Sequence, residues 1–269
     1  MYYDFSNLNI DPIAIQIGPI AIRWYALAYL AGLLLGWRYC LFLVRRTPFV
    51  MAPAKLEDLL VYSTAGIIFG GRLGYVLFYN PVFFLNNPME IMMIWNGGMS
   101  FHGGFLGVVI ASLIFSRRNG IETLPLADLL AAAAPLGLFF GRIANFVNGE
   151  LFGRVTDVPW AIIFPNGGNH PRHPSQLYEA GLEGLLLFAI IGILALLTTA
   201  RRYPGLLLGV FLSGYGATRA FVEFYREPDA HLGFILSYLT MGQILSLPMI
   251  LLGIVFFCLS IKRPPITNE

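Results

Sequence analysis

Three arginines lie inside long apolar runs of the chain, at Arg72, Arg142 and Arg219. A charged side chain in such surroundings costs about 2.5–3.5 kcal/mol at the centre of a membrane helix, so each of the three requires a reason. The planar guanidinium group forms forked hydrogen bonds with phosphate oxygens, which a lysine ammonium group cannot reproduce. The three arginines are therefore candidates for binding a phosphate ester in an apolar environment.

Other polar residues follow Arg142 closely along the chain. Asn145 comes at i+3, on the same face of a helix, and Asn148 and Glu150 come soon after it. A single arginine that only anchors a helix end does not require polar neighbours of this kind. The segment therefore indicates a polar site.

A second polar stripe surrounds Arg219. Tyr215, Arg219 and Glu223 are spaced i, i+4 and i+8, which places them on one face of a helix, and Arg226 follows about one turn later. The spacing predicts that this helix presents its polar face to a partner or a ligand.

The composition excludes a water-soluble fold. The chain is 57% hydrophobic and 12% charged, with a mean hydropathy of +0.70, whereas soluble domains are roughly a quarter charged. The net charge of +2 is small, so there is no basic stripe of the kind that would indicate nucleic-acid binding. Cys40 and Cys258 lie in apolar runs, and we interpret both as buried, small hydrophobic residues.

Seven segments are apolar over enough residues to be expected as transmembrane helices. They are Ile22–Val44, Leu56–Phe78, Phe101–Phe115, Leu126–Val147, Gly181–Thr199, Gly205–Phe224 and Tyr238–Ile261. We predict an all-α polytopic protein, in which residues 1–269 form a single integral membrane domain. The connection at about residues 149–178 is rich in Gly, Pro and Asn and is expected to form a small extracytoplasmic cap, with a short strand in VPWAIIF.

The basic residues predict the orientation of these segments. Arg and Lys follow the first, third, fifth and seventh segments, whereas Asn80–Ser100 contains neither. By the positive-inside rule, the N-terminus is outside and the C-terminus is cytoplasmic. A rise of about 1.5 Å per residue then places the three arginines at a similar height, about 21–24 Å from the cytoplasmic helix ends. Arg23, Tyr25 and His102 fall in the same outer layer, which favours one shared polar site over separate anchors.

Phospholipid head groups are the abundant phosphates at that depth. The residues alone therefore indicate a protein that binds an anionic phospholipid and could react with it. A membrane transporter is an alternative, because transporters also keep charges at depth, but no internal repeat is evident. A non-catalytic phospholipid-binding protein is a second alternative, and it would not require a general base.

Four motifs decide between these alternatives. The segment GRIANFVNGELFGR (Gly141–Arg154) resembles the signature of the prolipoprotein diacylglyceryl transferase family. SFHGGFLG (Ser100–Gly107), HPSQLYEA (His173–Ala180) and YGATRAFVEFYREPD (Tyr215–Asp229) also resemble motifs of that family, in the same order. The resemblance covers nearly the whole chain, and Ala144 is a small departure where the family often has Gly.

The resemblance implies an activity. Members of this family transfer the sn-1,2-diacylglyceryl group of phosphatidylglycerol to the lipobox cysteine thiol of a preprolipoprotein, and release sn-glycerol 1-phosphate. It implies phosphatidylglycerol, the preprolipoprotein signal peptide and the lipid bilayer as partners. It also implies the bacterial plasma (inner) membrane as the location, and no cofactor or metal.

The resemblance also suggests roles for individual residues. Arg142 matches the phosphate-binding arginine of the family, and Arg219 matches a second essential arginine. His102 matches the histidine of the HGG motif and is a candidate general base, although a lone histidine at a helix start could instead orient a neighbour. Glu150, or the electrostatic field of the arginines, is the competing activator of the thiol. The remaining matched positions are expected to bind substrate or shape the site, namely Tyr25, Asn145, Asn148, Gly153, Tyr215, Glu223 and Arg226.

Overall fold

The computed structural model of this protein describes residues 2–8, 11–18, 20–228 and 239–267. The chain divides into two compact units. One contains Met1–Cys40 and Asp128–Thr267, and the other contains Leu41–Ala127. Most of the described residues of both units are helical, as the apolar composition predicts.

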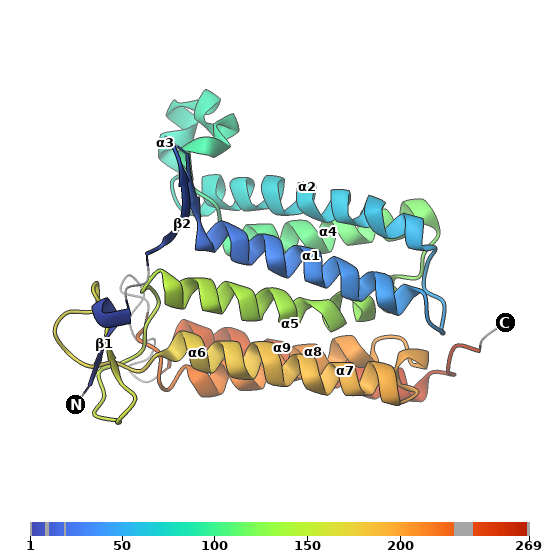
Figure 1. Ribbon diagram of the computed structural model, residues 1–269. Coiled ribbons are helices and arrows are strands. Elements are labelled where there is room, and N and C mark those ends of the chain that lie inside the picture. Colours follow the sequence, from blue (N-terminus) through green and yellow to red (C-terminus); the bar gives the residue numbers. More distant parts are fainter. Residues whose placement is uncertain (1, 9–10, 19, 229–238, 268–269) are drawn as a thin grey trace. The chain divides into compact units, whose positions relative to one another are not determined.

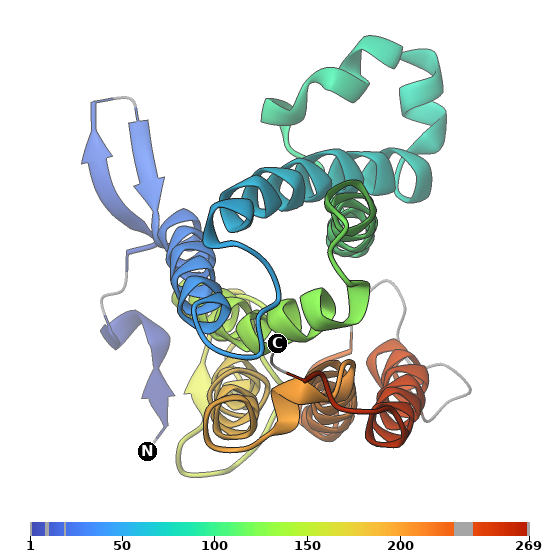
Figure 2. The ribbon, with the colours of Figure 1, turned by 90° about the vertical axis from the view of Figure 1, so that its right-hand side faces the viewer.

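The first unit consists mainly of long helices (Figure 1). They are α1 (Trp24–Val44), α5 (Thr123–Val147), α6 (Ser175–Glu179), which continues through the π-helix η4 (Ala180–Leu186) into α7 (Leu187–Leu197), then α8 (Leu206–Val222) and α9 (Met241–Lys262). The short 3-10 helix η5 (Ala200–Arg202) precedes α8. Helix α8 packs between α7 and α9, as Figure 2 shows.

The second unit is built on two helices, α2 (Pro53–Phe78) and α4 (Phe101–Asn119), which pack side by side in opposite directions (Figure 1). Glycines allow this close approach, because a Cβ atom on Gly70 would lie 2.4 Å from the carbonyl oxygen of Gly103. Three short helical segments connect the pair, namely α3 (Pro81–Asn86), η2 (Pro88–Met92) and η3 (Ile94–Asn96).

Short strands and an aromatic cluster form the cap of the first unit. β1 (Tyr3–Asp4) precedes the 3-10 helix η1 (Phe5–Leu8) and pairs in parallel with β4 (Ile162–Ile163), which lies within VPWAIIF as predicted. Phe5, Ile162 and Phe164 are buried together, so the N-terminal segment also belongs to the cap. A separate antiparallel hairpin, β2 (Ile13–Ile17) with β3 (Ile20–Arg23), leads into α1.

The chain is a polytopic membrane protein. Five described helical stretches are long and apolar enough to cross a membrane: α1, α2, α5, the stretch Ser175–Leu197, and α9. Helix α8 is apolar but shorter, with 17 residues, and α4 has 19 residues. A helix lies within each of the seven predicted segments. Ile22 and Arg23, the predicted start of the first one, belong instead to strand β3, and Tyr238, the predicted start of the last one, lies outside the described residues.

Two sequence-based expectations are wrong. The fifth helix begins at Ser175 and not at Gly181, because its first turns carry polar side chains that are buried against polar partners and so do not appear as an apolar run. Cys258 is exposed, whereas Cys40 is buried as expected. The reason is that only one side of α9 packs against α8, and Cys258 lies on its exposed surface.

Candidate active site

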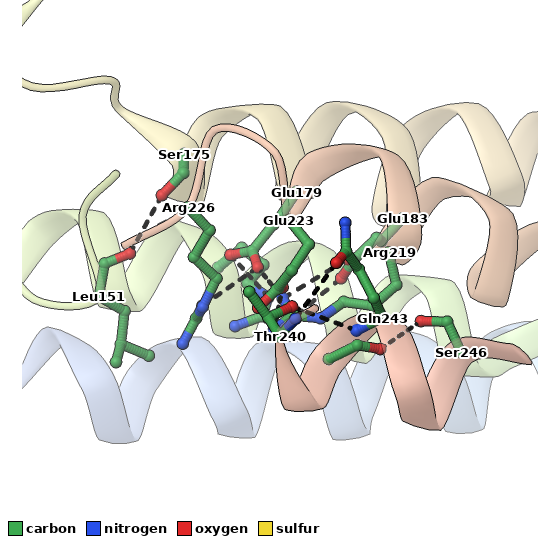
Figure 3. Close-up of polar contacts among 12 residues, drawn as sticks. Leu151, Ser175, Glu179, Glu183, Arg219, Glu223, Arg226, Thr240, Gln243 and Ser246 are labelled. Atoms are coloured by element: carbon green, nitrogen blue, oxygen red, sulfur yellow. Dashed lines mark hydrogen bonds and ion pairs between the residues drawn. The ribbon is translucent and has the colours of Figure 1, made fainter. Parts of the chain in front are cut away.

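Charged side chains of the first unit meet between α5, α8 and the helix that begins at Ser175. Helix α5 supplies Arg142, and the last turn of α8 supplies Arg219, where a cation interacts favourably with the helix dipole. The third helix supplies Glu179 and, one turn later, Glu183. Figure 3 shows Arg219 and the two glutamates close together.

Glu179 is the centre of this cluster. Its Oε1 accepts hydrogen bonds from Nη1 of Arg219 and, at 3.2 Å, from Nη1 of Arg226. Its Oε2 lies 3.3 Å from Nε of Arg142. The Glu179 side chain is completely buried, so one carboxylate that solvent does not reach pairs with guanidinium groups from α5 and from the end of α8.

Two more carboxylates complete the cluster. Oε2 of Glu183 accepts from Nη2 of Arg142 at 3.5 Å, and its Oε1 lies 4.0 Å from Nη1 of Arg219. Oε2 of Glu223 lies 2.9 Å from Nη2 of Arg219. This last ion pair joins residues at i and i+4, which is the stripe that the sequence predicts on α8.

The formal charges of the cluster cancel, because three arginines face three glutamates. Isolated charges would not be stable at this burial, whereas a fully paired network is tolerated. The Arg142 and Arg219 side chains remain 17% and 16% exposed. No described residue pairs with Nη1 of Arg142 or Nε of Arg219, so each arginine retains a donor for an anionic ligand.

A second carboxylate site follows the end of α5. Oε1 of Glu150 accepts hydrogen bonds from the side-chain amides of Asn145, at 2.9 Å, and Asn148, at 3.2 Å. The structure therefore brings these three predicted site residues together. Both amides bond to one oxygen, which orients the Glu150 carboxylate and leaves Oε2 without a described hydrogen-bond partner.

The turn after Glu150 is held from the start of α6. Leu151 has a φ of 56°, a left-handed conformation that is strained for a residue with a side chain. Ser175 donates to the carbonyl of Leu151 at 3.2 Å, and Gln176 donates to the carbonyl of Glu150 at 2.6 Å. Both side chains are completely buried, so the HPSQ motif serves to hold this turn.

Gly153 allows the cap to approach the end of α8. A Cβ atom at this position would lie 2.4 Å from the carbonyl oxygen of Tyr225. The next residue, Arg154, donates from Nε to the carbonyl of Arg226 at 2.9 Å and from Nη2 to the carbonyl of Glu223 at 3.2 Å. These contacts hold the turn that carries Glu223 and Arg226, which gives Gly153 a structural reason to be glycine.

Two tyrosines border the charged groups. The hydroxyl groups of Tyr25 and Tyr29 lie 3.1 Å apart, and Tyr25 also interacts electrostatically with Glu150. Tyr215 stacks on Phe211 and interacts electrostatically with Glu183. Both predicted tyrosines are therefore near the carboxylates of the first unit.

His102 belongs to the second unit, in the first turn of α4. Ser100 caps this helix by accepting from the backbone N–H of Gly103 at 3.2 Å. The His102 side chain is exposed and packs edge-on against Phe101. No hydrogen bond joins its imidazole to another described residue. Among those residues, His102 therefore has no hydrogen-bonded neighbour that it could orient.

Arg72 has a different role from the one predicted. Its guanidinium group donates to five backbone carbonyls of the α2–α4 connection, those of Glu90, Ile91, Met93, Gly97 and Gly98. A guanidinium group has five N–H donors, so none remains for a phosphate. The prediction that Arg72 contributes to the phosphate site is therefore wrong. The connection has no basic residue of its own, and Arg72 satisfies its carbonyls instead.

Sequence reasoning missed Glu179 and Glu183 as site residues. A signal was available, because the two carboxylates are four residues apart beside an apolar run, and buried arginines require counter-ions. Starting the fifth helix at Gly181 placed Glu179 outside the predicted span. Glu183 lies within that span, but the predicted site rests on the buried arginines and not on their counter-ions.

No group of three His, Cys, Asp or Glu side chains in the described part of the chain is arranged to hold a metal ion. The acidic residues of the cluster are instead paired with guanidinium groups.

Comparison with known proteins agrees with the motifs. A family model described as "Prolipoprotein diacylglyceryl transferase" matches residues 12–259. A phosphatidylglycerol–prolipoprotein diacylglyceryl transferase of Paramagnetospirillum magneticum is 59% identical over 264 residues, which cover 98% of each chain. Proteins of the same name from Rhodospirillum rubrum and Azospirillum brasilense are 59% and 54% identical. These two matches cover 96% and 95% of this chain, and 94% and 96% of the relatives.

Proposed function

This chain belongs to the prolipoprotein diacylglyceryl transferase family, and on that premise we propose how its residues carry out the reaction. The protein is a phosphatidylglycerol–prolipoprotein diacylglyceryl transferase and acts in lipoprotein maturation. Its substrates are phosphatidylglycerol and the lipobox cysteine of a preprolipoprotein signal peptide. The sn-1,2-diacylglyceryl group moves to the thiol, and sn-glycerol 1-phosphate leaves.

The Arg142–Glu179–Arg219 arrangement is the observation that carries this proposal. The reaction breaks the bond between a glyceryl carbon and a phosphate oxygen and forms a carbon–sulfur bond. The phosphate thereby changes from a diester with one negative charge to a monoester with two. Nη1 of Arg142 and Nε of Arg219 are the donors available for that additional charge. Such preoriented donors usually provide the largest electrostatic contribution to catalysis.

The glutamates position the arginines in this proposal. Glu179 and Glu183 each interact with both Arg142 and Arg219. Their carboxylates restrict the two flexible side chains before the lipid binds, so less ordering is required in the transition state. Arg226 and Glu223 extend the same network at the end of α8.

The attacking thiol must lose its proton. A free cysteine has a pKa near 8.5, so a positioned base or a cationic field increases the thiolate fraction at neutral pH. His102 is the first candidate base. Glu150 competes with it, supported by the two amides that orient its carboxylate. The field of the paired arginines is the third candidate.

The membrane arrangement is also part of the proposal. Residues 1–269 form one integral membrane domain with seven transmembrane helices, the N-terminus outside and the C-terminus in the cytoplasm. The cap at about residues 149–178 faces the outside, and the protein resides in the bacterial plasma (inner) membrane. The absence of basic residues from Asn80–Ser100, in contrast to the connections after α1 and α4, supports this orientation.

A transfer assay with purified protein tests the proposed function. Phosphatidylglycerol labelled in its acyl chains is mixed with a lipobox peptide, and label on the peptide is measured together with released glycerol phosphate. We expect transfer by the parent protein and almost none by Arg142→Ala, with both proteins equally folded. Lipid binding without transfer by the parent would favour a non-catalytic lipid-binding protein, and equal transfer by Arg142→Ala would remove the role of this arginine.

A further inference from the structure

A buried carboxylate at the opposite end of α8 has no role in the proposed chemistry. Asp128 lies near the start of α5 and is 5% exposed. Its Oδ2 accepts from the backbone N–H of Gly205 at 2.7 Å, and its Oδ1 accepts from the backbone N–H of Leu208 at 2.7 Å. A single side chain of α5 thus binds the first turn of α8.

Helix α8 lacks an ordinary cap of its own. Its N-cap residue is Gly205, with a φ of 93° and no side chain that could accept from the first turn. Exposed N–H groups at a helix start require acceptors, and a negative charge there also interacts favourably with the helix dipole. Asp128 supplies both the acceptor oxygens and the negative charge from a different helix. The contact therefore fixes where α8 begins relative to α5.

The distance along the helix from this contact to the active site is the same in α5 and in α8. Arg142 lies 14 residues after Asp128, and Arg219 lies 14 residues after Gly205. At 1.5 Å per residue, both arginines are about 21 Å from the Asp128–Gly205 contact. Both contact Glu179, so the two helices run in parallel and join at both ends.

We propose that Asp128 is a positioning residue that sets the register of Arg142 and Arg219 for diacylglyceryl transfer. This inference rests on the proposed function. A slip of one residue along α8 would move Arg219 by about 1.5 Å along the axis and turn its side chain by about 100°. Misplacement of a reacting group by about 1 Å can reduce a rate by about 100-fold.

The first experiment compares Asp128→Asn with the matched control Asp58→Asn, whose carboxylate is exposed on α2. The amide has almost the same shape as the carboxylate but only one acceptor oxygen for the two N–H groups. We expect kcat for transfer to fall about 10-fold to 100-fold in Asp128→Asn, with a much smaller change in the KM for phosphatidylglycerol. Asp58→Asn should match the parent. An unchanged kcat in Asp128→Asn would overturn the inference.

A double-mutant cycle with Arg219→Lys separates positioning from a general loss of stability. Substitutions this far apart with no shared partner normally act independently, to within about a factor of two. If Asp128 acts through Arg219, Asp128→Asn should lower kcat much less when Arg219 is already lysine. Equal fold losses in both backgrounds would overturn the inference.

A second variant keeps the test decisive if Asp128→Asn does not fold. Asp128→Glu retains the charge and lengthens the side chain by one methylene, so it should also lose kcat and show the same dependence on Arg219. Full activity in Asp128→Glu would show that charge alone matters, which contradicts a register role. Absence of transfer by the parent protein would instead refute the proposed function.

Discussion

Replacement of Glu179 by glutamine tests the centre of the charged cluster. The glutamate is completely buried, accepts hydrogen bonds from Arg219 and Arg226, and forms an ion pair with Arg142. Glutamine has nearly the same volume, but its amide nitrogen would face a guanidinium donor, and the cluster would contain one more positive than negative charge. The substitution therefore removes a counter-ion without creating a cavity.

The expected magnitude follows from this burial. Removing one partner of a buried ion pair destabilises a protein by about 3–5 kcal/mol, because the remaining charge is left uncompensated. Glu183 still pairs with two of the arginines, so we expect Glu179→Gln to lie at the lower end of that range. Because the guanidinium groups lose their common anchor, we expect transfer to fall by about 100-fold to 1,000-fold.

The assay combines label transfer with thermal unfolding in detergent. Glu57→Gln is the matched control, because Glu57 is exposed at the start of α2, and it should retain the transfer rate and melting temperature of the parent. Transfer is measured below the melting temperature of the variant, so that unfolding is not mistaken for a loss of catalytic activity. A Glu179→Gln protein with parental transfer would refute the argument that this carboxylate positions the arginines.

Four further predictions concern single features. Arg142→Lys should retain less than about a tenth of the parental transfer rate, because an ammonium group lacks the forked geometry of a guanidinium group. Arg219→Ala should be nearly inactive. Both rates are measured by label transfer. If His102 is the base, the ratio of the His102→Gln rate to the parental rate should increase as the pH rises from roughly 7 to 9. The reason is that hydroxide then forms the thiolate of the substrate cysteine, whose pKa is ~8.5. A pH-independent ratio of the two rates would leave Glu150 or the arginines as activators. A reporter fused after Lys262 should report a cytoplasmic location, and a reporter inserted within residues 166–169 should report an outside location. Reversed signals would contradict the proposed orientation.

The class of protein and the approximate positions of its long helices can be predicted from the amino-acid sequence alone. Apolar runs of membrane-spanning length are a local property, because each helix satisfies its own backbone hydrogen bonds. The stripe Tyr215–Arg219–Glu223 was likewise predicted from spacing alone, and the pair between Arg219 and Glu223 is present at 2.9 Å. The four motifs were sufficient to identify the family.

Which charges pair with each other depends on the tertiary structure. Arg72 and Arg142 look alike in the sequence, since both are arginines near the C-terminal end of an apolar run. One satisfies backbone carbonyls of its neighbouring connection, and the other pairs with Glu179 and Glu183, more than 30 residues away. The partner of a buried charge depends on packing between helices, which the pattern within one helix does not encode.

The same reason explains the contact of Asp128. In the sequence it is a single carboxylate at the start of an apolar segment, and it could equally have been a surface residue. Its partners are backbone N–H groups of Gly205 and Leu208, which carry no side-chain signature. Local sequence therefore specifies where helices form and which residues can do chemistry. Long-range packing determines their register, and with it the geometry of the site.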